Sequence, residues 1–190
     1  MENYPKLSFR KMNLEDVFTF RNWGRNDSPL LLEYNFIEES EEDIIEWFKW
    51  KTKRPLSEYF VIESDERIIG YLSLKNINKI LKKAELGVVL DPNYINQGIG
   101  KKILGLFLTY LKDRGFKKII LFVADYNKRA KRCYEELGFK RTYSFLMKFP
   151  NGSYDENIPD FYENKSSFKI ILNRTFNYAT KMDIDLERDW

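Results

Sequence analysis

Residues 93–104 read NYINQGIGKKIL, and the interpretation of the whole chain depends on this stretch. A strand-like segment at residues 83–90 precedes it, and a helical apolar spacing over residues 100–114 follows it. Lys101 and Lys102 therefore fall in the expected first turn of a helix. The helix dipole places partial positive charge there, so each lysine should cost roughly a few tenths of a kcal/mol. An anionic ligand bound at this turn would reverse the sign of that interaction.

Gly98 and Gly100 would let the backbone approach such a ligand, because glycine adopts dihedral angles closed to other residues and glycine turns at helix N-termini bind phosphate. A flexible turn with solvated lysines is the alternative. Two familiar phosphate motifs do not fit. Ile95 stands where the P-loop has its first glycine, and Ile103 stands at the third glycine of G-x-G-x-x-G.

A second motif, NKRAKRCYEELGF at residues 127–139, follows one expected strand later. Together with ELGVVLDPNYINQGIGKKIL it resembles the GNAT family of acyl-CoA-dependent N-acyltransferases, and weaker similarity extends over residues 7–148. The resemblance implies an enzyme that transfers the acetyl group of acetyl-CoA to a primary amine by direct attack. A non-catalytic module that binds or senses acyl-CoA with the same fold is the alternative.

In that family the segment before the helix binds the pyrophosphate of coenzyme A, with the pattern Arg/Gln-x-x-Gly-x-Gly/Ala. Gly98 and Gly100 match this pattern, whereas Ile95 departs from it, and a neighbouring lysine would supply the missing charge. The pantetheine arm is expected to bond to the main chain before Asp91 and to the side chain of Asn127, which also fits an ordinary helix N-cap. The expected cofactor-binding residues are Val88, Val89, Leu90, Ile95, Asn96, Gln97, Gly98, Ile99, Gly100, Lys101, Lys102, Asn127 and Ala130.

Two residues are candidates for proton transfer. Tyr134 lies seven residues after Asn127, about 10 Å along the same helix face, and it would donate a proton to the departing thiolate. Packing in the core is the alternative for this tyrosine. No histidine exists to accept the proton of the amine, so Glu85 is the candidate base, directly or through water. A surface ion pair with Lys82 or Lys83 is its alternative.

The acceptor amine is less well defined. The resemblance places the acceptor site near the first two helices, and a loop at residues 150–164 contains acidic residues without lysine or arginine. Acidic walls favour a small cationic amine or a peptide N-terminus over neutral amines, although solvated surface is the usual role of such charges. The start LSFR at residues 7–10 also resembles the branch that acetylates ribosomal-protein N-termini. The residues concerned are Trp23, Glu33, Tyr34, Glu38 and Glu39 near the helices and Asp155, Glu156, Asp160 and Glu163 in the loop.

Composition sets limits on the remaining possibilities. The 190 residues are 43% apolar and carry a net charge of +3, which predicts one domain over residues 1–178 with a charged, loosely held tail at 179–190. A dispersed charge this small argues against nucleic acid or a membrane surface as partner. One cysteine, Cys133, excludes an internal disulfide and is expected to be a small buried residue; with no histidine, no metal site is expected. We expect a cytoplasmic monomer or homodimer.

The order of elements predicts an α/β (α+β) sandwich in which helices cover both faces of a mixed, mostly antiparallel sheet that splays around the acyl-CoA site. The strand at residues 119–124 is apolar without alternation, so we expect it to be buried on both faces. Helices are expected at 13–24, 40–54, 100–114 and 127–138, and strands at 6–11, 58–63, 67–75, 83–90, 119–124, 140–148 and 168–174.

Overall fold

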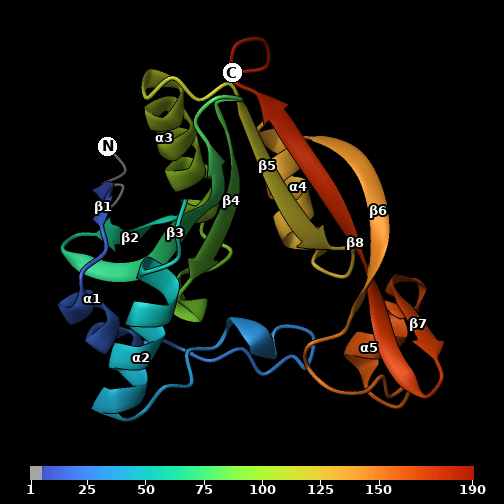
Figure 1. Cartoon of the computed structure of the whole chain (residues 1–190). Helices are drawn as coiled ribbons and strands as arrows, with labels where there is room; N and C mark the ends of the chain where they lie inside the picture. Colours follow the sequence, from blue (N-terminus) through green and yellow to red (C-terminus); the bar gives the residue numbers. More distant parts are fainter. Residues whose placement is uncertain (1–5) are drawn as a thin grey trace. The chain divides into compact units, whose positions relative to one another are not determined.

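The computed structural model describes residues 6–190, and these contain eight strands and five α-helices (Figure 1). The elements group into two units. The first comprises the described residues up to Arg25, together with Phe36–Ile119 and Asp185–Trp190. The second comprises Asn26–Asn35 and Ile120–Ile184. Each unit is described separately below.

The first unit contains an antiparallel sheet in the order β1-β2-β3-β4, with α1 and α2 on one face and α3 on the other (Figure 1). Because both faces are covered, the central strand β2 is apolar along most of its length and Phe60, Val61 and Ile62 are fully buried. The elements are β1 (Leu7–Lys11), α1 (Leu14–Thr19), η1 (Phe20–Asn22), α2 (Glu41–Thr52), β2 (Glu58–Ser64), β3 (Arg67–Asn78), β4 (Lys83–Leu90), η3 (Pro92–Tyr94) and α3 (Ile99–Asp113).

Helix α1 begins where the sequence provides a complete cap. The Asn13 side chain accepts a hydrogen bond from the backbone N–H of Asp16, and the Asp16 carboxylate accepts one from the N–H of Asn13. Asp16 is buried, and Arg10 donates to both of its carboxylate oxygens at 2.7 and 2.8 Å. This bidentate pair satisfies the buried charge and connects α1 to β1.

The second unit contains the strand order β5-β8-β6, and β7 pairs with β8. Strand β8 is antiparallel to both β6 and β7. A small aromatic core forms beside these strands, in which Phe149, Phe161 and Phe168 contact one another edge to face. The elements are η2 (Leu32–Tyr34), β5 (Lys118–Ala124), α4 (Lys128–Glu136), β6 (Lys140–Lys148), α5 (Pro159–Glu163), η4 (Lys165–Ser167), β7 (Phe168–Ile171) and β8 (Arg174–Asp185).

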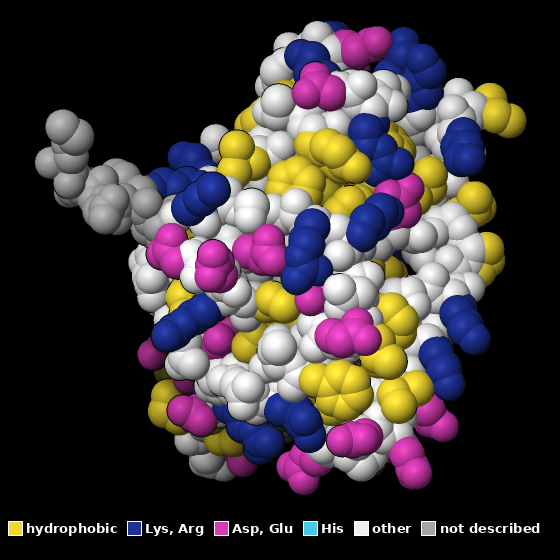
Figure 2. Space-filling model, turned by 90° about the vertical axis from the view of Figure 1, so that its left-hand side faces the viewer, with side chains coloured by type: hydrophobic (Ala, Val, Ile, Leu, Met, Phe, Trp, Pro, Cys, Tyr) yellow, Lys and Arg dark blue, Asp and Glu magenta, His cyan; other side chains and the backbone are white. Residues whose placement is uncertain are grey.

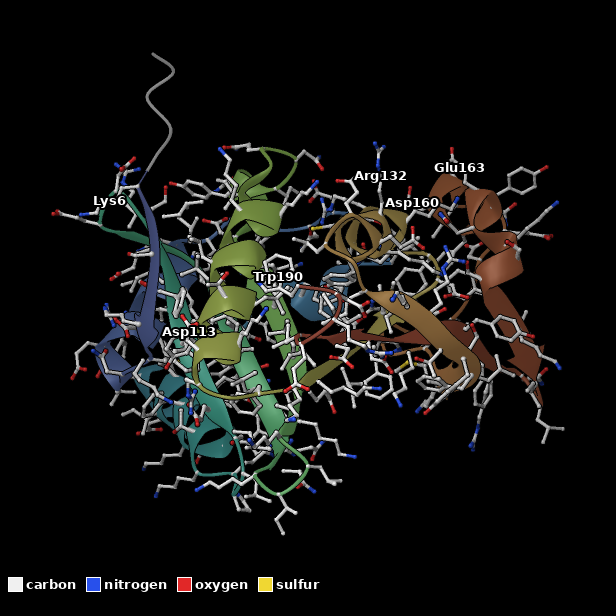
Figure 3. All side chains as sticks on the ribbon, turned by 90° about the horizontal axis from the view of Figure 1, so that it is seen from above. Lys6, Asp113, Arg132, Asp160, Glu163 and Trp190 are labelled. Carbon is white, nitrogen blue, oxygen red and sulfur yellow. The ribbon has the colours of Figure 1, made fainter. Side chains whose placement is uncertain are left out.

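The three successive strands predicted at 58–63, 67–75 and 83–90 are confirmed as β2, β3 and β4, which pair as an antiparallel meander, and α3 and α4 begin within a residue of their expected starts. Two details were wrong. Strand β5 is not buried on both faces, since Phe122 is 45% exposed and packs edge to face on Phe145. The loop at 150–164 is not wholly polar surface, since it contains α5 and buries Phe161; Figure 3 labels Asp160 and Glu163 of this short helix.

The expected loose tail is also wrong for most of its length. Strand β8 continues through Asp185, and the side chains of Met182, Ile184 and Leu186 are buried. At the C-terminus the indole N–H of Trp190 donates a hydrogen bond to the hydroxyl of Thr109 on α3 at 3.2 Å. Figure 3 labels Trp190. These apolar residues alternate with charged ones, which raised the average polarity of the segment and hid its strand character.

On the face of the molecule shown in Figure 2, basic and acidic side chains are interspersed, so the charge there is locally balanced. A search of residues 6–190 finds no helix with the length and hydrophobicity needed to cross a membrane.

Candidate active site

The turn before α3 has the geometry of an open helix N-terminus. Gly98 is the N-cap residue and adopts a left-handed conformation with φ 73° and ψ −4°. It makes no side-chain cap, and the first turn contains no acidic residue. The first intrahelical bond runs from the N–H of Lys102 to the carbonyl of Gly98 at 3.2 Å. The N–H groups of the first helical turn precede any carbonyl of the helix that could accept from them. Asn96, Gln97 and Gly98, which lead into the helix, are exposed.

The two glycines of the turn differ in their conformation and surroundings. A Cβ added at Gly98 would meet no atom within 4 Å, so the requirement there is conformational, because its positive φ is rarely adopted by other L-residues. A Cβ added at Gly100 would lie 3.4 Å from Cδ1 of Leu90, an ordinary van der Waals contact, so the fold itself does not require a glycine there. Asn96 also has a positive φ, 62°, which makes the turn tight before the helix begins.

Asp91 holds this turn in place. Its buried carboxylate oxygen Oδ1 accepts hydrogen bonds from the N–H groups of Asn93 and Gly24, both at 2.9 Å. A Cβ at Gly24 would come within 2.7 Å of the Asn93 side chain, so the two segments pack closely. The side chain of Asp91, which precedes Pro92, therefore fixes the start of the glycine turn.

The other expected cofactor residues of the first unit occupy the end of β4 and the turn. Val88, Val89 and Leu90 are half-buried and pair with Leu72, Tyr71 and Gly70 of β3. Ile95, at the position where the family pattern has a basic or amide side chain, is half-buried, and Lys101 and Lys102 are exposed.

Glu85 lies on β4 opposite Lys75 of β3 and is half-buried. Asn76 donates a hydrogen bond to its Oε2 at 2.8 Å. Its charge is also near the phenol of Tyr59 and raises the pKa of that hydroxyl, behind the larger effect of burial. The alternative considered for Glu85 was an ion pair with Lys82 or Lys83. Among the described residues, the partner of its carboxylate is instead the amide of Asn76.

In the second unit, Asn127 caps α4. Its Oδ1 accepts a hydrogen bond from the N–H of Ala130 at 3.1 Å, and its amide also donates to the hydroxyl of Tyr34. Asn127 therefore has the N-cap role that was its alternative in the sequence, and its side chain also contacts Tyr34. Tyr134, two turns later, packs edge to face on Phe139 with ring centroids 5.9 Å apart. Burial raises the pKa of the Tyr134 hydroxyl, and the neighbouring Tyr34 and Cys133 raise it further.

A cluster that the sequence did not reveal lies beside this helix. The hydroxyl of Tyr126 donates a hydrogen bond to Oε1 of Glu33 at 3.3 Å. Burial raises the pKa of Glu33, while the phenols of Tyr126 and Tyr34 lower it. Burial and the Glu33 charge raise the pKa of Tyr34 to about 12. Glu33 was expected only as one of several residues near the acceptor, and no sequence spacing connects it to Tyr126, 93 residues away.

The remaining acceptor candidates are dispersed. Trp23 serves the core, because it stacks on Phe20 at 4.0 Å and its indole donates to the carbonyl of Ile68. Asp155 accepts hydrogen bonds from the backbone and side chain of Asn157, both at 2.9 Å, and Asp160 accepts one from Ser28. Asp155 therefore stabilises its own turn, whereas Asp160 connects α5 to the segment that contains Ser28.

Comparison with known proteins identifies the family. The model of the acetyltransferase (GNAT) family matches residues 21–139, which is more than half of the chain. This chain belongs to the GNAT family. The match spans both motifs and confirms the predicted family and, with it, the predicted class of acetyltransferase.

Individual relatives of this GNAT protein agree. A spermidine N(1)-acetyltransferase of Vibrio cholerae is 27% identical over 156 residues, covering 80% of this chain and 89% of that protein. An uncharacterized N-acetyltransferase of Methanocaldococcus jannaschii is 29% identical over 143 residues. The alignment covers 67% of this chain but only 63% of that protein.

Solved structures confirm the fold. The crystal structure of the Vibrio cholerae spermidine N-acetyltransferase in complex with CoA and spermine has a TM-score of 0.70 to this chain at 22% identity and covers 96% of both chains. Another structure of that enzyme, with a TM-score of 0.64 at 20% identity, is described as dodecameric. The predicted α/β sandwich of the GNAT type is therefore correct.

Proposed function

We propose that this chain transfers the acetyl group of acetyl-CoA to a primary amine. One observation carries the proposal: the start of α3 is an exposed helix N-terminus with a left-handed glycine cap and no acidic residue in its first turn. Such a terminus favours an anion, because its N–H groups and its dipole both present positive charge. In a GNAT protein the anion that fits is the pyrophosphate of coenzyme A.

The residues present suit this ligand. Backbone N–H groups from Asn96 to Lys101 would bind the phosphates, and the absence of a basic side chain at Ile95 leaves those backbone donors in place. Lys101 and Lys102 would supply the charge that Ile95 lacks. We assign the pantetheine arm to the main chain of Val88–Leu90 and to Asn127 and Ala130. When bound, acetyl-CoA supplies an activated acetyl thioester.

Tyr134 is proposed as the general acid. The transfer expels a thiolate, and a phenol within hydrogen-bond reach can protonate it. The raised pKa of Tyr134 keeps its hydroxyl protonated at neutral pH, so the proton is available when it is needed. Glu85 is proposed to take the proton of the amine, directly or through water, since its half-buried carboxylate has Asn76 to orient it.

For the acceptor we propose a cationic amine, with spermidine as the first compound to test and a peptide N-terminus as the second. The spermidine acetyltransferases among the relatives support the first choice. The ribosomal-protein branch, suggested by the residues of β1, stays a prediction. A cytoplasmic location and a monomeric or homodimeric state also stay predictions.

The alternative is a non-catalytic module that binds acyl-CoA, for which Ile95 is the supporting observation. The named acetyltransferases among the relatives favour the enzyme. A module without activity would bind acetyl-CoA but would release no CoA in the presence of any amine.

The first experiment measures the melting temperature with and without acetyl-CoA, followed by CoA release in the presence of spermidine. A ligand at about 100 times its dissociation constant stabilises the folded state by about 2.7 kcal/mol. For a chain of this size that corresponds to a rise of roughly 5–10 °C. Acetate at the same concentration should give no rise. The proposal would be abandoned if acetyl-CoA neither raised the melting temperature nor was consumed with any amine of a broad panel.

A further inference from the structure

The turn between β3 and β4 presents two aliphatic side chains to the solvent. Ile80 is 92% exposed and Leu81 is 58% exposed. The loop before β2 lies beside the end of β3, because the carbonyl of Leu56 accepts a hydrogen bond from the N–H of Ile77 at 3.0 Å. Leu56 is itself 60% exposed. Two neighbouring segments of the first unit thus expose three large aliphatic side chains.

The same two segments are strongly basic. Residues 49–57 and 75–83 contain eight lysines and arginines and no acidic residue. The net charge of the whole chain is only +3, so positive charge is concentrated in these segments. Burial, and after it the charges of Lys75 and Arg54, lower the pKa of Lys51 to about 8. The cations of the two segments therefore act on one another.

The acidic residues that follow these segments in the sequence have other partners. Within the described part of the chain, Glu58 pairs with Lys11 and Arg114. The carboxylate of Glu85 accepts a hydrogen bond from the amide of Asn76. The lysines at positions 53, 79 and 82 are exposed, and their charge is available to an anion in solution.

A tryptophan lies at the edge of the basic segments. Trp50, at the end of α2, is 55% exposed, and the cations of Lys51 and Arg54 lie over its ring at 4.4 and 4.8 Å from the centroid. Tryptophan is enriched where a membrane meets water, because its ring is apolar and its N–H is polar. The combination of aliphatic residues, a tryptophan and lysines is typical of interfacial protein segments.

The turn is held in one conformation by hydrogen bonds. The N–H of Leu81 donates to Oδ1 of Asn78 at 2.8 Å. The carbonyl of Lys82 accepts from the N–H groups of Lys117 and Lys118, at 2.7 and 3.3 Å. The exposed side chains therefore stand on a fixed support, and a partner that covers them does not have to order the turn first.

We propose that the basic turn, defined as Leu56, Ile80 and Leu81 with the lysines and the arginine of residues 49–57 and 75–83, docks on an anionic lipid surface. The cations would lie among the headgroups, and the aliphatic side chains would enter the boundary of the acyl chains. The expectation that no membrane surface is a partner rested on the net charge of the whole chain, not on its distribution. Such docking goes beyond the proposed acetyl transfer and does not depend on it.

Charge and shape favour lipid over other anions. A nucleic acid would use the cations, but it would give Ile80 and Leu81 no role, because single strands bind proteins through phosphate contacts and base stacking. A lipid surface uses both the cations and the aliphatic side chains. The contribution of the aliphatic pair therefore distinguishes the two kinds of partner.

The test is flotation of the full chain with vesicles of phosphatidylcholine and phosphatidylglycerol, compared with vesicles of phosphatidylcholine alone. We expect binding to the first and not to the second. Ile80→Ser/Leu81→Ser should weaken binding at least about tenfold, the factor expected for burial of one such side chain. Lys79→Gln/Lys82→Gln should weaken it about 25-fold, since each basic residue near an anionic surface contributes about fivefold.

Matched controls exist in the second unit. Leu172→Ser changes a residue that is also 92% exposed, in the turn between β7 and β8. Lys148→Gln/Lys169→Gln removes the same charge from two exposed positions. Both controls should bind the anionic vesicles like the wild type. All of these variants should keep the melting temperature of the wild type and its release of CoA with spermidine.

Tryptophan emission separates insertion from attraction by charge alone. Leu81→Trp should gain an emission component that shifts to shorter wavelength with the anionic vesicles, whereas the added component of Leu172→Trp should not shift. Each is measured as the difference from the wild type, which has four tryptophans.

Three results would overturn the docking proposal. The first is absence of wild-type binding to anionic vesicles, even where a single-stranded RNA or a polyglutamate peptide binds. The second is binding that the lysine variant weakens and the aliphatic variant does not. The third is an unshifted emission of Leu81→Trp. Failure to consume acetyl-CoA would instead overturn the proposed function and leave the vesicle result as it is.

Discussion

The start of α3 and the cluster around Glu33 handle charge in opposite ways. At α3 the donors are main-chain N–H groups of consecutive residues, and a left-handed glycine with no side chain keeps the approach open. Around Glu33 the polar groups are side chains from segments 93 residues apart, and a buried aromatic core fixes them. The first arrangement favours an anion, whereas the second fixes a carboxylate.

The two regions should also respond differently to mutation. A main-chain site is damaged by changing backbone conformation, whereas substituting exposed side chains changes it little. A side-chain cluster is damaged by removing single atoms while the backbone stays as it is. The following predictions use this difference.

The largest effect is expected from Tyr134→Phe, which removes one oxygen atom and leaves the packing on Phe139 intact. If this hydroxyl protonates the leaving thiolate, kcat should fall about 100-fold or more while the KM for acetyl-CoA stays the same. Steady-state kinetics with spermidine would measure both constants. The matched control is Tyr143→Phe, at an exposed tyrosine of β6 in the same unit. Equal activity of the two variants would remove Tyr134 from the mechanism.

A smaller effect, on binding, is expected from Gly98→Val. A β-branched residue at φ 73° costs about 1–2 kcal/mol, and relief of that strain moves the N–H groups of the turn. The KM for acetyl-CoA should rise about tenfold, the factor that corresponds to about 1.4 kcal/mol. Gly115→Val is an apt control, because Gly115 follows the other end of α3, has φ 82° and also has an open Cβ position.

Both glycine variants should therefore lose similar stability in urea unfolding, and only Gly98→Val should lose affinity for acetyl-CoA. Equal losses of affinity would mean that the effect comes from helix stability and not from the anion site.

The start of α3 could be predicted from the sequence because the residues that form it are close together in the chain. The glycine spacing, the lysines of the first turn and the apolar pattern of α3 all lie within residues 93–113, and the strand predicted before them, at residues 83–90, is present as β4. What the sequence did not show was Asp91 holding Gly24, since that contact joins segments 67 residues apart.

The second region could not be predicted in the same way. Glu33 lies in a short 3-10 helix without periodicity, and Tyr126, in the turn between β5 and α4, directly precedes the motif at residues 127–139 without being part of it. Similarly, the pairing of β8 with both β6 and β7 depends on the turn at Leu172 and Asn173, where two residues with positive φ split one expected strand into two. In each case a contact distant in sequence decided the outcome.

The smallest effect sharpens the comparison most. Tyr126→Phe keeps the aromatic stack on Phe168 and removes one donor from Glu33. The hydrogen bond from Tyr126 lowers the pKa of Glu33, so it favours the ionised carboxylate in the folded state. Its loss should therefore reduce stability at neutral pH and have less effect at acidic pH, where Glu33 is protonated in both variants.

A hydrogen bond of this kind contributes about 0.5–1.5 kcal/mol, so the free energy of unfolding of Tyr126→Phe should fall by about that amount at neutral pH. Urea unfolding at neutral and acidic pH measures it, with Tyr162→Phe as the control because Tyr162 is 60% exposed on α5 in the same unit. An equal loss at both pH values would show that Tyr126 acts on packing alone. A loss that appears at neutral pH in Tyr126→Phe, and is absent in Glu33→Gln/Tyr126→Phe relative to Glu33→Gln, would connect the phenol to the carboxylate, because the hydrogen bond needs an ionised Glu33 to favour.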